Sequence, residues 1–395
     1  MNILMPTSSY PLPSQPSWGP FVRETALALA DHGHKVTLLI FSPNNQRNEY
    51  LEAKNSRVRV IAYPYLVAGK PVLHCSVGLI PSLRKSPLGY LQIPSYVVSS
   101  AIEILKAIRE YEIDLIHAMW YLPMGFISTL LKPLHKKPVV VTGLGADLHL
   151  ANNFLTRSFL QFTAKHADRN IVCSKYLEEK ALSYGIPPNT FNVIPNGVCL
   201  DHFVVHRRVA CKGTVRIGCA KRLIPEKNLQ DLILAVKSLP DELLNIIEVF
   251  IAGDGPISEL LHALIQAYGL SHKIHLIGDI PHQEIPKFLS GIDIVVDTST
   301  QEGLATSNIE ALASGCILIA PDGYGNRELV QHTVNGFLYK ARNVEDLASL
   351  LSQVIQDVNE TKEWSQKAFD SIQTRFDVKV VAHHLSEVYA RVLEA

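Results

Sequence analysis

Short apolar runs alternate with longer amphipathic segments along the 395-residue chain, and this alternation most strongly limits the folds open to it. Runs rich in Val, Ile and Leu, such as 35–41 and 292–297, have the length of buried strands. The segments 21–32 and 228–238 have the length and pattern of helices, and 64–94, which has no clear period, is predicted to be a long loop. Because alternating strands and helices form parallel sheets covered on both faces, an α/β protein is predicted.

The alternation occurs twice, with a break over 203–213. We therefore predict a first doubly wound domain over 1–205, a linker over 206–213 and a second doubly wound domain over 214–375. A last helix within 376–395 follows without a further strand and is expected to return to the first domain. Ligands of open α/β sheets bind beyond the carboxyl ends of the strands. Two facing domains would therefore place a cleft between two such edges.

The composition excludes some classes of partner. Hydrophobic residues make up 47% of the chain and the formal net charge is +0, so we expect a globular protein without a global basic field. Nucleic acid is therefore not an expected partner. Lys132, His135, Lys136 and Lys137 form a local basic group that fits a solvated helix end.

The sequence also predicts a compartment. Six cysteines without a C-x-x-C pair indicate a reduced chain. Residues 1–6 have no basic region and too short an apolar run for a signal peptide, and the apolar run of about 20 residues needed to span a bilayer is missing. We therefore expect a cytoplasmic protein, and contact with the inner face of the membrane stays open.

Two carboxylates follow the apolar run 292–296. Glu302 and Glu310 are separated by seven residues, and a short helix is predicted to begin between them. The N-terminus of such a helix offers free N–H groups and a positive dipole end to an anion. The spacing alone arises by chance about once in a chain of this size. Ser307 with Glu310 also fits a capping box, which would give this glutamate a purely structural use.

Two cations follow another predicted strand, 214–220. Arg222 and Lys227 stand between the end of this strand and the next predicted helix, a position that suits a diphosphate. An ordinary basic loop is the alternative. Gly19 lies between the first strand and the first helix, where a residue without a side chain lets the backbone approach a ligand, and simple turn chemistry is its alternative.

The remaining motifs exclude more than they predict. His117 ends a strand, and a single histidine is more often structural than catalytic. Gly143-x-Gly145 and Gly253-x-Gly255 each lack the third glycine of a dinucleotide fingerprint, so NAD binding is not supported. Metal-binding motifs and a P-loop are absent from the sequence, and neither a metal nor another cofactor is expected.

Taken together, the motifs resemble the retaining GT-B glycosyltransferases of group 1, the large family that includes sucrose synthase, sucrose-phosphate synthase and bacterial mannosyl- and glucosyltransferases. The resemblance runs over nearly the whole chain, and the order of the motifs is more specific than any one of them. The matching segments are 33–37, 114–118, 195–203, 222–227, 253–256, 302–311 and 325–328.

The resemblance implies a GT-B fold, two Rossmann-like domains facing a cleft, with the acceptor on the first domain and the donor on the second. It implies that Arg222 and Lys227 hold the donor diphosphate, that Glu310 binds the ribose and that Glu302 contacts the transferred sugar. A catalytic role extends to these cations, Glu302 and His117. The further donor contacts implied by the resemblance are Gly19, Gly278, Ile280, Leu304, Ala305 and Thr306.

Family members retain the anomeric configuration and need no metal; the leaving phosphate takes the acceptor proton. We therefore expect transfer of a sugar from a UDP- or GDP-sugar to a glycan, a lipid-linked acceptor or a small metabolite. Trp18, Pro20, Met119 and Leu144 depart from the family pattern on the acceptor side. A nucleotide-sugar epimerase and a non-catalytic nucleotide-sugar-binding subunit are the alternatives.

Overall fold

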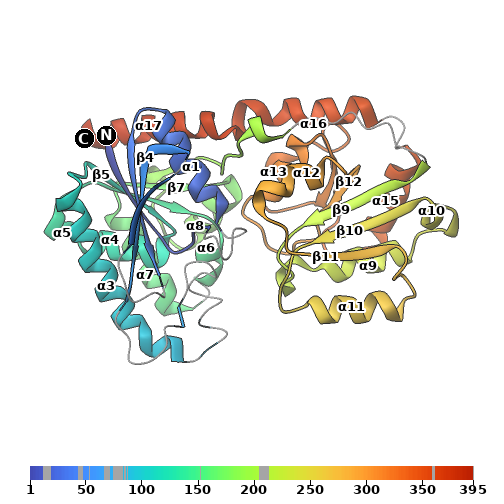
Figure 1. Cartoon of the computed structure of the whole chain (residues 1–395), viewed down its shortest axis with the longest axis horizontal. Coiled ribbons are helices and arrows are strands. Elements are labelled where there is room, and N and C mark those ends of the chain that lie inside the picture. Colours follow the sequence, from blue (N-terminus) through green and yellow to red (C-terminus); the bar gives the residue numbers. More distant parts are fainter. Residues whose placement is uncertain are drawn as a thin grey trace. The chain divides into compact units, whose positions relative to one another are not determined.

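The computed structural model describes residues 1–11, 19–42, 48–52, 54–65, 72–73, 83, 86, 88–151, 153–203, 213–357 and 361–394. It divides the chain into two units, which are coloured by sequence in Figure 1. The first unit contains Met1–Gly197 and Val378–Ala395, and the second unit contains Val198–Asp377. Each unit is built around its own sheet.

The first sheet has eight strands in the order β3-β4-β2-β1-β5-β6-β7-β8. All neighbours are parallel except β3 and β4, which are antiparallel. The sequence analysis missed β3, and its expectation of parallel pairing is wrong at this edge, where a short connection allows an antiparallel pair. The strands are β1 (Asn2–Thr7), β2 (Lys35–Phe41), β3 (Asn48–Glu52), β4 (Asn55–Tyr63), β5 (Leu115–Met119), β6 (Val139–Gly143), β7 (Arg169–Val172) and β8 (Phe191–Val193).

Two helices of the first unit begin at a side-chain cap. Asn153 and Ser174 accept hydrogen bonds from the N–H groups of Thr156 and Leu177 and so begin α7 and α8. The helices are α1 (Pro20–Asp31), α3 (Leu88–Glu110), α4 (Phe126–Leu130), α5 (Lys132–His135), α6 (Ala146–Leu150), α7 (Phe154–His166), α8 (Lys175–Ser183) and α17 (Val378–Glu394), with single turns at η1 (Tyr121–Gly125) and η2 (Pro188–Thr190).

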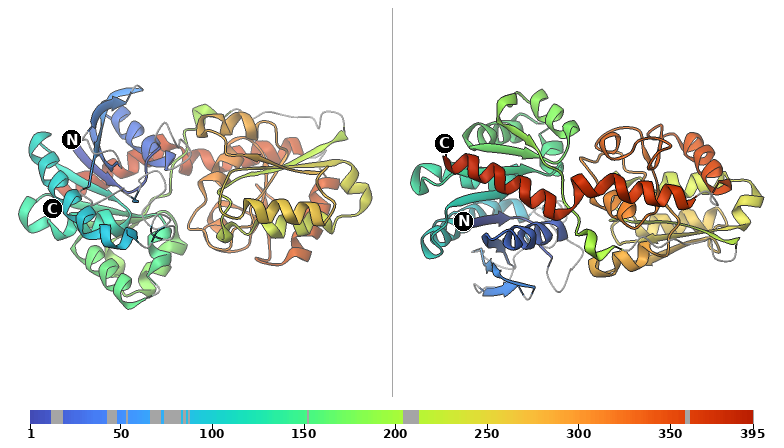
Figure 2. Two further views of the ribbon diagram at one scale, coloured as in Figure 1. Left: turned by 60° about the horizontal axis from the view of Figure 1, so that its bottom comes forward. Right: turned by 90° about the horizontal axis from the view of Figure 1, so that it is seen from above.

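One helix of this unit corrects a prediction, and another ends the chain. The loop predicted over 64–94 is wrong at its end, because α3 already begins at Leu88 and contains Pro94. A proline removes a single helical hydrogen bond, and the flanking turns of this long helix retain theirs. The C-terminal helix α17 packs against α1, and Figure 2 shows it running along the first unit.

The second sheet has six parallel strands in the order β11-β10-β9-β12-β13-β14. Its strands are nearly continuous apolar runs, as expected for a sheet buried on both faces. The strands are β9 (Val215–Ala220), β10 (Ile247–Ala252), β11 (Ile274–Gly278), β12 (Ile294–Val296), β13 (Ile317–Pro321) and β14 (Phe337–Tyr339).

The helices of this unit bury apolar stripes against the sheet. In α9 the stripe is Leu229, Leu232, Ile233 and Val236, the spacing that places side chains on one helical face. The helices are α9 (Leu229–Lys237), α10 (Asp241–Asn245), α11 (Ser258–Ala267), α12 (Ile285–Leu289), α13 (Thr306–Ala313), α14 (Asn326–Leu329), α15 (Val344–Gln356) and α16 (Thr361–Phe376), with single turns at η3 (Leu200–His202), η5 (Pro225–Lys227) and η6 (His282–Glu284).

The first stretch of the first unit ends at Gly197, earlier than the predicted boundary at 205. The N–H of Val198 donates to the carbonyl of Phe376 at 2.8 Å, so the two places where the chain changes units are joined. A side chain at Gly197 would begin 2.5 Å from the Cα of Val378, which explains the glycine of this motif. Of the predicted linker 206–213, only Gly213 lies among the described residues.

Across the described part of the chain, every helix is too short or too polar to cross a bilayer. Cys219 and Cys316 are buried free cysteines. Burial raises the pKa of the Cys219 thiol to about 12, so this residue behaves as a small apolar side chain.

Candidate functional site

The order of the second sheet locates a crevice. From β9 the chain proceeds to β10 and β11 on one side, and then to β12, β13 and β14 on the other. The reversal lies between β9 and β12, which are neighbours with Ile294 opposite Ile217. Ligands of doubly wound sheets bind beyond the carboxyl ends of the strands at such a reversal. The loops after β9 and β12 are therefore the first place to look for a site.

Hydrogen bonds to two backbone carbonyls hold these two loops together. The hydroxyl of Thr298 donates to the carbonyl of Lys227 at 2.8 Å, and the N–H of Thr300 donates to the carbonyl of Glu226 at 2.9 Å. As a result the ammonium of Lys227 forms an ion pair with the carboxylate of Glu302, and each side chain is only 16% exposed. The structure thus brings together two of the residues predicted from the sequence.

The surroundings of Lys227 lower the pKa of its ammonium group. Burial, followed by the positive charge of Lys221, lowers the pKa of Lys227, while Asp297 acts in the opposite direction. The Glu302 carboxylate also favours the charged form. Arg222, the other predicted cation, follows Lys221 and is exposed. An anion that enters here meets cations at the end of β9.

The start of α13 is the third part of the site. Ala305 precedes this helix, and α13 has no side-chain cap on its first N–H groups. Leu304 and Ala305 are buried and Thr306 is half-buried. These backbone donors and the positive end of the helix are thus left for an anion. The predicted capping box is wrong, because the helix begins at Thr306 and the Glu310 side chain turns elsewhere.

Glu310 instead points to the loop after β11. Its Oε1 lies 2.8 Å from Nε2 of His282, and its side chain is 7% exposed. His282 stands directly after the loop that contains Gly278 and Ile280, so it brings the predicted base-binding loop beside this carboxylate. Gly278 has a φ of 77°, which favours glycine. The sequence analysis missed His282, and its position after this loop was the available signal.

A glycine holds the Glu302 loop from the other side. The N–H of Gly325 donates to the carbonyl of Glu302 at 3.4 Å. A side chain at Gly325 would collide with the carbonyl of Gly303. The motif Gly325–Glu328 therefore contains a glycine because two backbones meet there.

The first sheet has a reversal of its own between β1 and β5. Gly19 follows β1 in the left-handed conformation, with a φ of 65°, and α1 begins after it. Trp120 follows β5 with a φ of 71°, a strained value for a tryptophan. The rings of Phe21 and Trp120 lie 5.9 Å apart in an edge-to-face arrangement. The sequence analysis missed both aromatic residues.

His117 is buried in the first unit. Its Nε2 lies 2.6 Å from the hydroxyl of Thr142, and its Nδ1 lies 2.6 Å from the hydroxyl of Tyr389. The imidazole is 1% exposed, and burial lowers its pKa to about 3. The structure therefore gives His117 a structural role between β5, β6 and α17 and does not support the catalytic role suggested for it.

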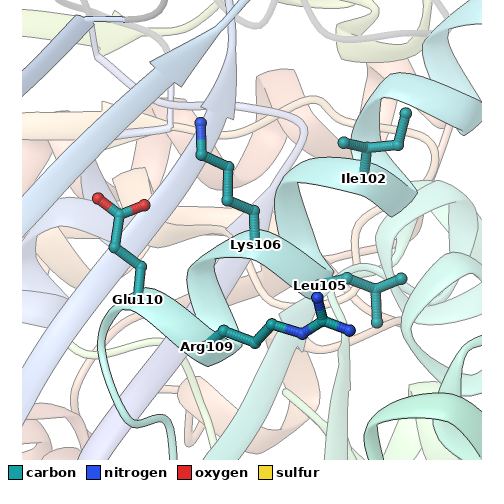
Figure 3. Close-up of a pocket in the computed structure, with 5 residues that line it drawn as sticks. All are labelled: Ile102, Leu105, Lys106, Arg109 and Glu110. Atoms are coloured by element: carbon teal, nitrogen blue, oxygen red, sulfur yellow. The ribbon is translucent and has the colours of Figure 1, made fainter.

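Two pockets lie apart from these residues in the described part of the first unit. One has a volume of about 480 Å³ along α3, and Figure 3 shows its lining residues Ile102, Leu105, Lys106, Arg109 and Glu110. The other, of about 890 Å³, includes Lys132, Lys136 and Lys137 of the predicted basic group. Lys132 is paired with Asp168 at 2.8 Å. Neither lining includes a predicted site residue.

Two family models match consecutive parts of the chain. The model described as "Glycosyltransferase Family 4" matches residues 19–202, and the one described as "Glycosyl transferases group 1" matches residues 209–371. TuaC of Bacillus subtilis, named as a glycosyltransferase of teichuronic acid biosynthesis, is 24% identical over 408 residues and 99% of each chain. The amylovoran biosynthesis glycosyltransferase AmsK of Erwinia amylovora is 26% identical over 55% of each.

Solved structures have the same fold. Sucrose-phosphate synthase from Thermosynechococcus elongatus has a TM-score of 0.81 and 19% identity, and the match covers 100% of this chain and 99% of that one. HepE of Anabaena, solved with UDP and glucose, has a TM-score of 0.76 and 20% identity over 99% of this chain and 100% of that one. This likeness over the whole length confirms the predicted GT-B fold class.

Proposed function

Because the chain belongs to the GT-B glycosyltransferases of group 1 and family 4, we propose that its second unit binds a nucleoside diphosphate sugar and transfers the sugar to an acceptor. The observation that carries this proposal is the pairing of Lys227 with Glu302 at the reversal between β9 and β12, beside the uncapped start of α13. Cations, backbone donors and carboxylates lie together there, as a charged diphosphate and a polyhydroxylated sugar require.

Each group has a separate task. Lys227, Arg222 and the N–H groups at Leu304, Ala305 and Thr306 bind the diphosphate. When the donor enters, Lys227 turns from Glu302 to a phosphate oxygen, and the released carboxylate accepts hydrogen bonds from hydroxyls of the sugar.

The other end of the donor lies beside Glu310. Its carboxylate binds the ribose, while His282 holds it in place from the loop after β11. Gly278 and Ile280 in that loop contact the base. Gly19 of the first unit is proposed as a further donor contact.

Catalysis rests on stabilising the departing diphosphate. As the bond from the anomeric carbon to the phosphate oxygen breaks, negative charge grows on that oxygen, and Lys227, Arg222 and the backbone donors stabilise it. The acceptor hydroxyl attacks the same face of the sugar, so the configuration is retained, and its proton passes to the leaving phosphate. This scheme needs no metal ion.

Donor and acceptor follow from the named relatives. HepE was solved with UDP-glucose, which supports a UDP-sugar as the first donor to test, with GDP-sugars second. TuaC and AmsK are named for the synthesis of polysaccharides, which supports a glycan or lipid-linked acceptor. We place the reaction in the cytoplasm, at the inner face of the membrane for a lipid-linked acceptor.

The test compares wild type with Glu302→Gln and Lys227→Ala on a panel of UDP- and GDP-sugars and glycan acceptors. Each substitution should lower kcat/KM by about 100-fold or more, the typical effect of removing one group that stabilises a departing charge. Lys132→Ala, which removes a paired lysine of the first unit, should leave the rate unchanged.

Three results would contradict the proposal. Wild-type rates in both site variants, with donor and acceptor identified, would show that the site is elsewhere. Consumption of UDP-N-acetylglucosamine without an acceptor would indicate the epimerase alternative. Nucleotide binding without turnover on any acceptor would indicate the binding subunit.

A further inference from the structure

A buried polar cluster lies under the candidate donor loops. It consists of Lys221, Asp297, Ser299, Asn308 and Asn326, called the anchor cluster below. The ammonium of Lys221 lies 2.8 Å from Oδ1 of Asp297, and the two side chains are 2% and 0% exposed. None of these side chains is among the proposed donor contacts, so the function described above leaves the cluster unexplained.

The Asp297 carboxylate joins the cluster together. Its Oδ1 also accepts a hydrogen bond of 2.8 Å from the N–H of Ser299, and its Oδ2 accepts one of 2.6 Å from the side-chain amide of Asn308. Asn308 in turn donates to Oδ1 of Asn326 at 3.0 Å. Lys221 lies 3.5 Å from Ser299 Oγ and from Asn308 Oδ1.

These bonds connect every element that carries a proposed donor contact at the reversal. Lys221 immediately precedes Arg222 at the end of β9, and Asp297 begins the loop that leads to Glu302. Asn308 stands in the first turn of α13, and Asn326 begins α14 beside the same loop. A shift of any one of these elements would therefore break a bond inside the cluster.

The anchor cluster has a large free-energy cost of desolvation compared with apolar core packing. Burial by itself would raise the pKa of the Asp297 carboxyl, but Lys221 and the hydrogen bonds hold it well below its usual range, so the pair stays charged. Taking two charges out of water costs several kcal/mol for each ion, and apolar residues of the same size often stabilise a protein as well or better. The directed bonds of the cluster give what apolar packing lacks, a fixed register between loops.

We propose that the Lys221–Asp297 pair, with Asn308, positions the donor site: it fixes the Glu302 loop and the start of α13 against Arg222 and Lys227, and it balances charge beside Lys227. This inference rests on the proposed donor site. Lys221 and Asp297 are positioning residues, since their side chains are buried beneath the groups that contact the donor.

The charge balance makes the proposal testable by pH. The charged groups near Lys227 are Lys221, Arg222, Glu226, Asp297 and Glu302. Neutralising Asp297 leaves the Lys221 charge unbalanced, which lowers the pKa of Lys227 further. Neutralising Lys221 has the opposite effect. Because a charged Lys227 binds the diphosphate, affinity should be lost at a lower pH in the first case and at a higher pH in the second.

The experiment uses the full chain and titrates UDP and GDP by calorimetry between pH 6 and pH 10. The single variants are Asp297→Asn and Lys221→Gln. The swap variant combines Asp297→Asn with Asn308→Asp, which returns a carboxylate to the reach of Lys221. Asp168→Asn is the matched control, because it removes the partner of Lys132, an ion pair of the same 2.8 Å length in the first unit.

We expect Asp297→Asn to weaken binding of the preferred nucleotide at least tenfold and to move the pH midpoint down, and Lys221→Gln to move it up. The swap variant should recover an affinity within about threefold of wild type and return the pH midpoint to the wild-type value. Hydrogen exchange over 298–307 in the nucleotide-free protein should be faster in Asp297→Asn than in wild type.

Folded single variants with wild-type affinity, pH midpoints and hydrogen exchange would overturn this inference alone. So would pH midpoints that move in the same direction in both single variants. A swap variant that regains thermal stability without regaining nucleotide affinity would also overturn it. Where Asp297→Asn does not fold, Lys221→Gln and the swap variant are used for the test. Failure of the wild type to bind either nucleotide would instead overturn the proposed donor site, and this inference with it.

Discussion

Lys227 and Glu302 form an ion pair with each other. Each is a charged group that the proposed reaction needs for a different part of the same ligand, and their ion pair keeps both charges satisfied until the ligand arrives. A donor must therefore break this pair before it gains its own contacts. Part of the binding free energy is spent on that exchange, and only a ligand with both a diphosphate and a sugar compensates both partners.

This exchange separates binding from transfer in one variant. In Glu302→Gln the ammonium of Lys227 loses its charged partner and is available to phosphate at once. Loss of the Glu302 charge also lowers the pKa of Lys227, so the comparison is made at pH 6, where the ammonium stays charged. At that pH we expect UDP, which has no sugar, to bind this variant as tightly as wild type or up to about tenfold more tightly, while transfer is lost. Calorimetry with UDP beside a transfer assay checks this. Weaker UDP binding in Glu302→Gln would contradict the exchange.

Glu310 permits an equally selective test. If its carboxylate binds the ribose, Glu310→Gln should weaken UDP about tenfold, since hydrogen bonds to a charged group are the strong ones. The analogue 2′,3′-dideoxyuridine diphosphate should bind wild type and variant equally, because the hydroxyls are missing. His282→Ala should have a smaller effect of the same kind. Equal losses for both nucleotides would place Glu310 away from the ribose.

At the scale of elements, α17 is held in the first unit by polar contacts as well as apolar ones. Tyr389 reaches His117, and Ser386 lies 2.8 Å from Nε2 of His34. Val381, Leu385 and other apolar residues of α17 are buried as well. Burial lowers the pKa of both histidines, so each is held in its neutral form in the folded protein. The docking of the terminal helix should therefore weaken in acid.

The sign of that dependence follows from His117. Its pKa is about 3 in the folded protein and 6.5 in the unfolded chain. Between these pH values the unfolded chain therefore binds more protons than the folded protein. Stability of the first unit is thus fully present above pH 6.5 and falls as the pH drops, by roughly 2 kcal/mol at pH 5. Urea unfolding at pH 7 and pH 5 measures it. In His117→Asn this dependence should shrink, and an unchanged slope would contradict the assignment.

At the scale of the whole molecule, the two units have separate sheets and the second has its own core. The proposed donor contacts other than Gly19 belong to the second unit. Helix α16, which closes this unit before the chain returns to the first, buries Ala368, Ile372 and Phe376 and contacts α13 and β13. The second unit therefore needs its chain up to 377 to complete its packing.

This organisation predicts the behaviour of fragments. The fragment 198–377 should fold and bind the preferred nucleotide with an affinity within about threefold of the full chain, because it contains the groups that hold the diphosphate and the ribose. The fragment 198–357, without α16, should lose cooperative unfolding and binding, because it exposes the apolar surface that α16 covers. Circular dichroism and calorimetry compare them. A folded 198–377 that binds no nucleotide would contradict the assignment to this unit.

Much of the fold was predictable because it is a local property of the sequence. Apolar runs of strand length and helical stripes such as that of α9 depend on neighbouring residues only, and their alternation implies parallel sheets. The antiparallel strand β3 and the early start of α3 were missed, since an edge strand is half polar and a proline normally argues against a helix. Pairing partners decide such cases, and they lie far away in sequence.

The sequence by itself determined which chemistry is available: two cations after β9, two carboxylates after β12, and a glycine at each place where backbones approach closely. Only the tertiary structure decided what each group does. It paired Lys227 with Glu302, turned Glu310 from its own helix to His282, buried His117 beneath α17, and placed Lys221 and Asp297 under the loops. The physical reason is that the role of a charged or polar side chain depends on its burial and on its partner, and both are set by residues that meet only when the sheets form.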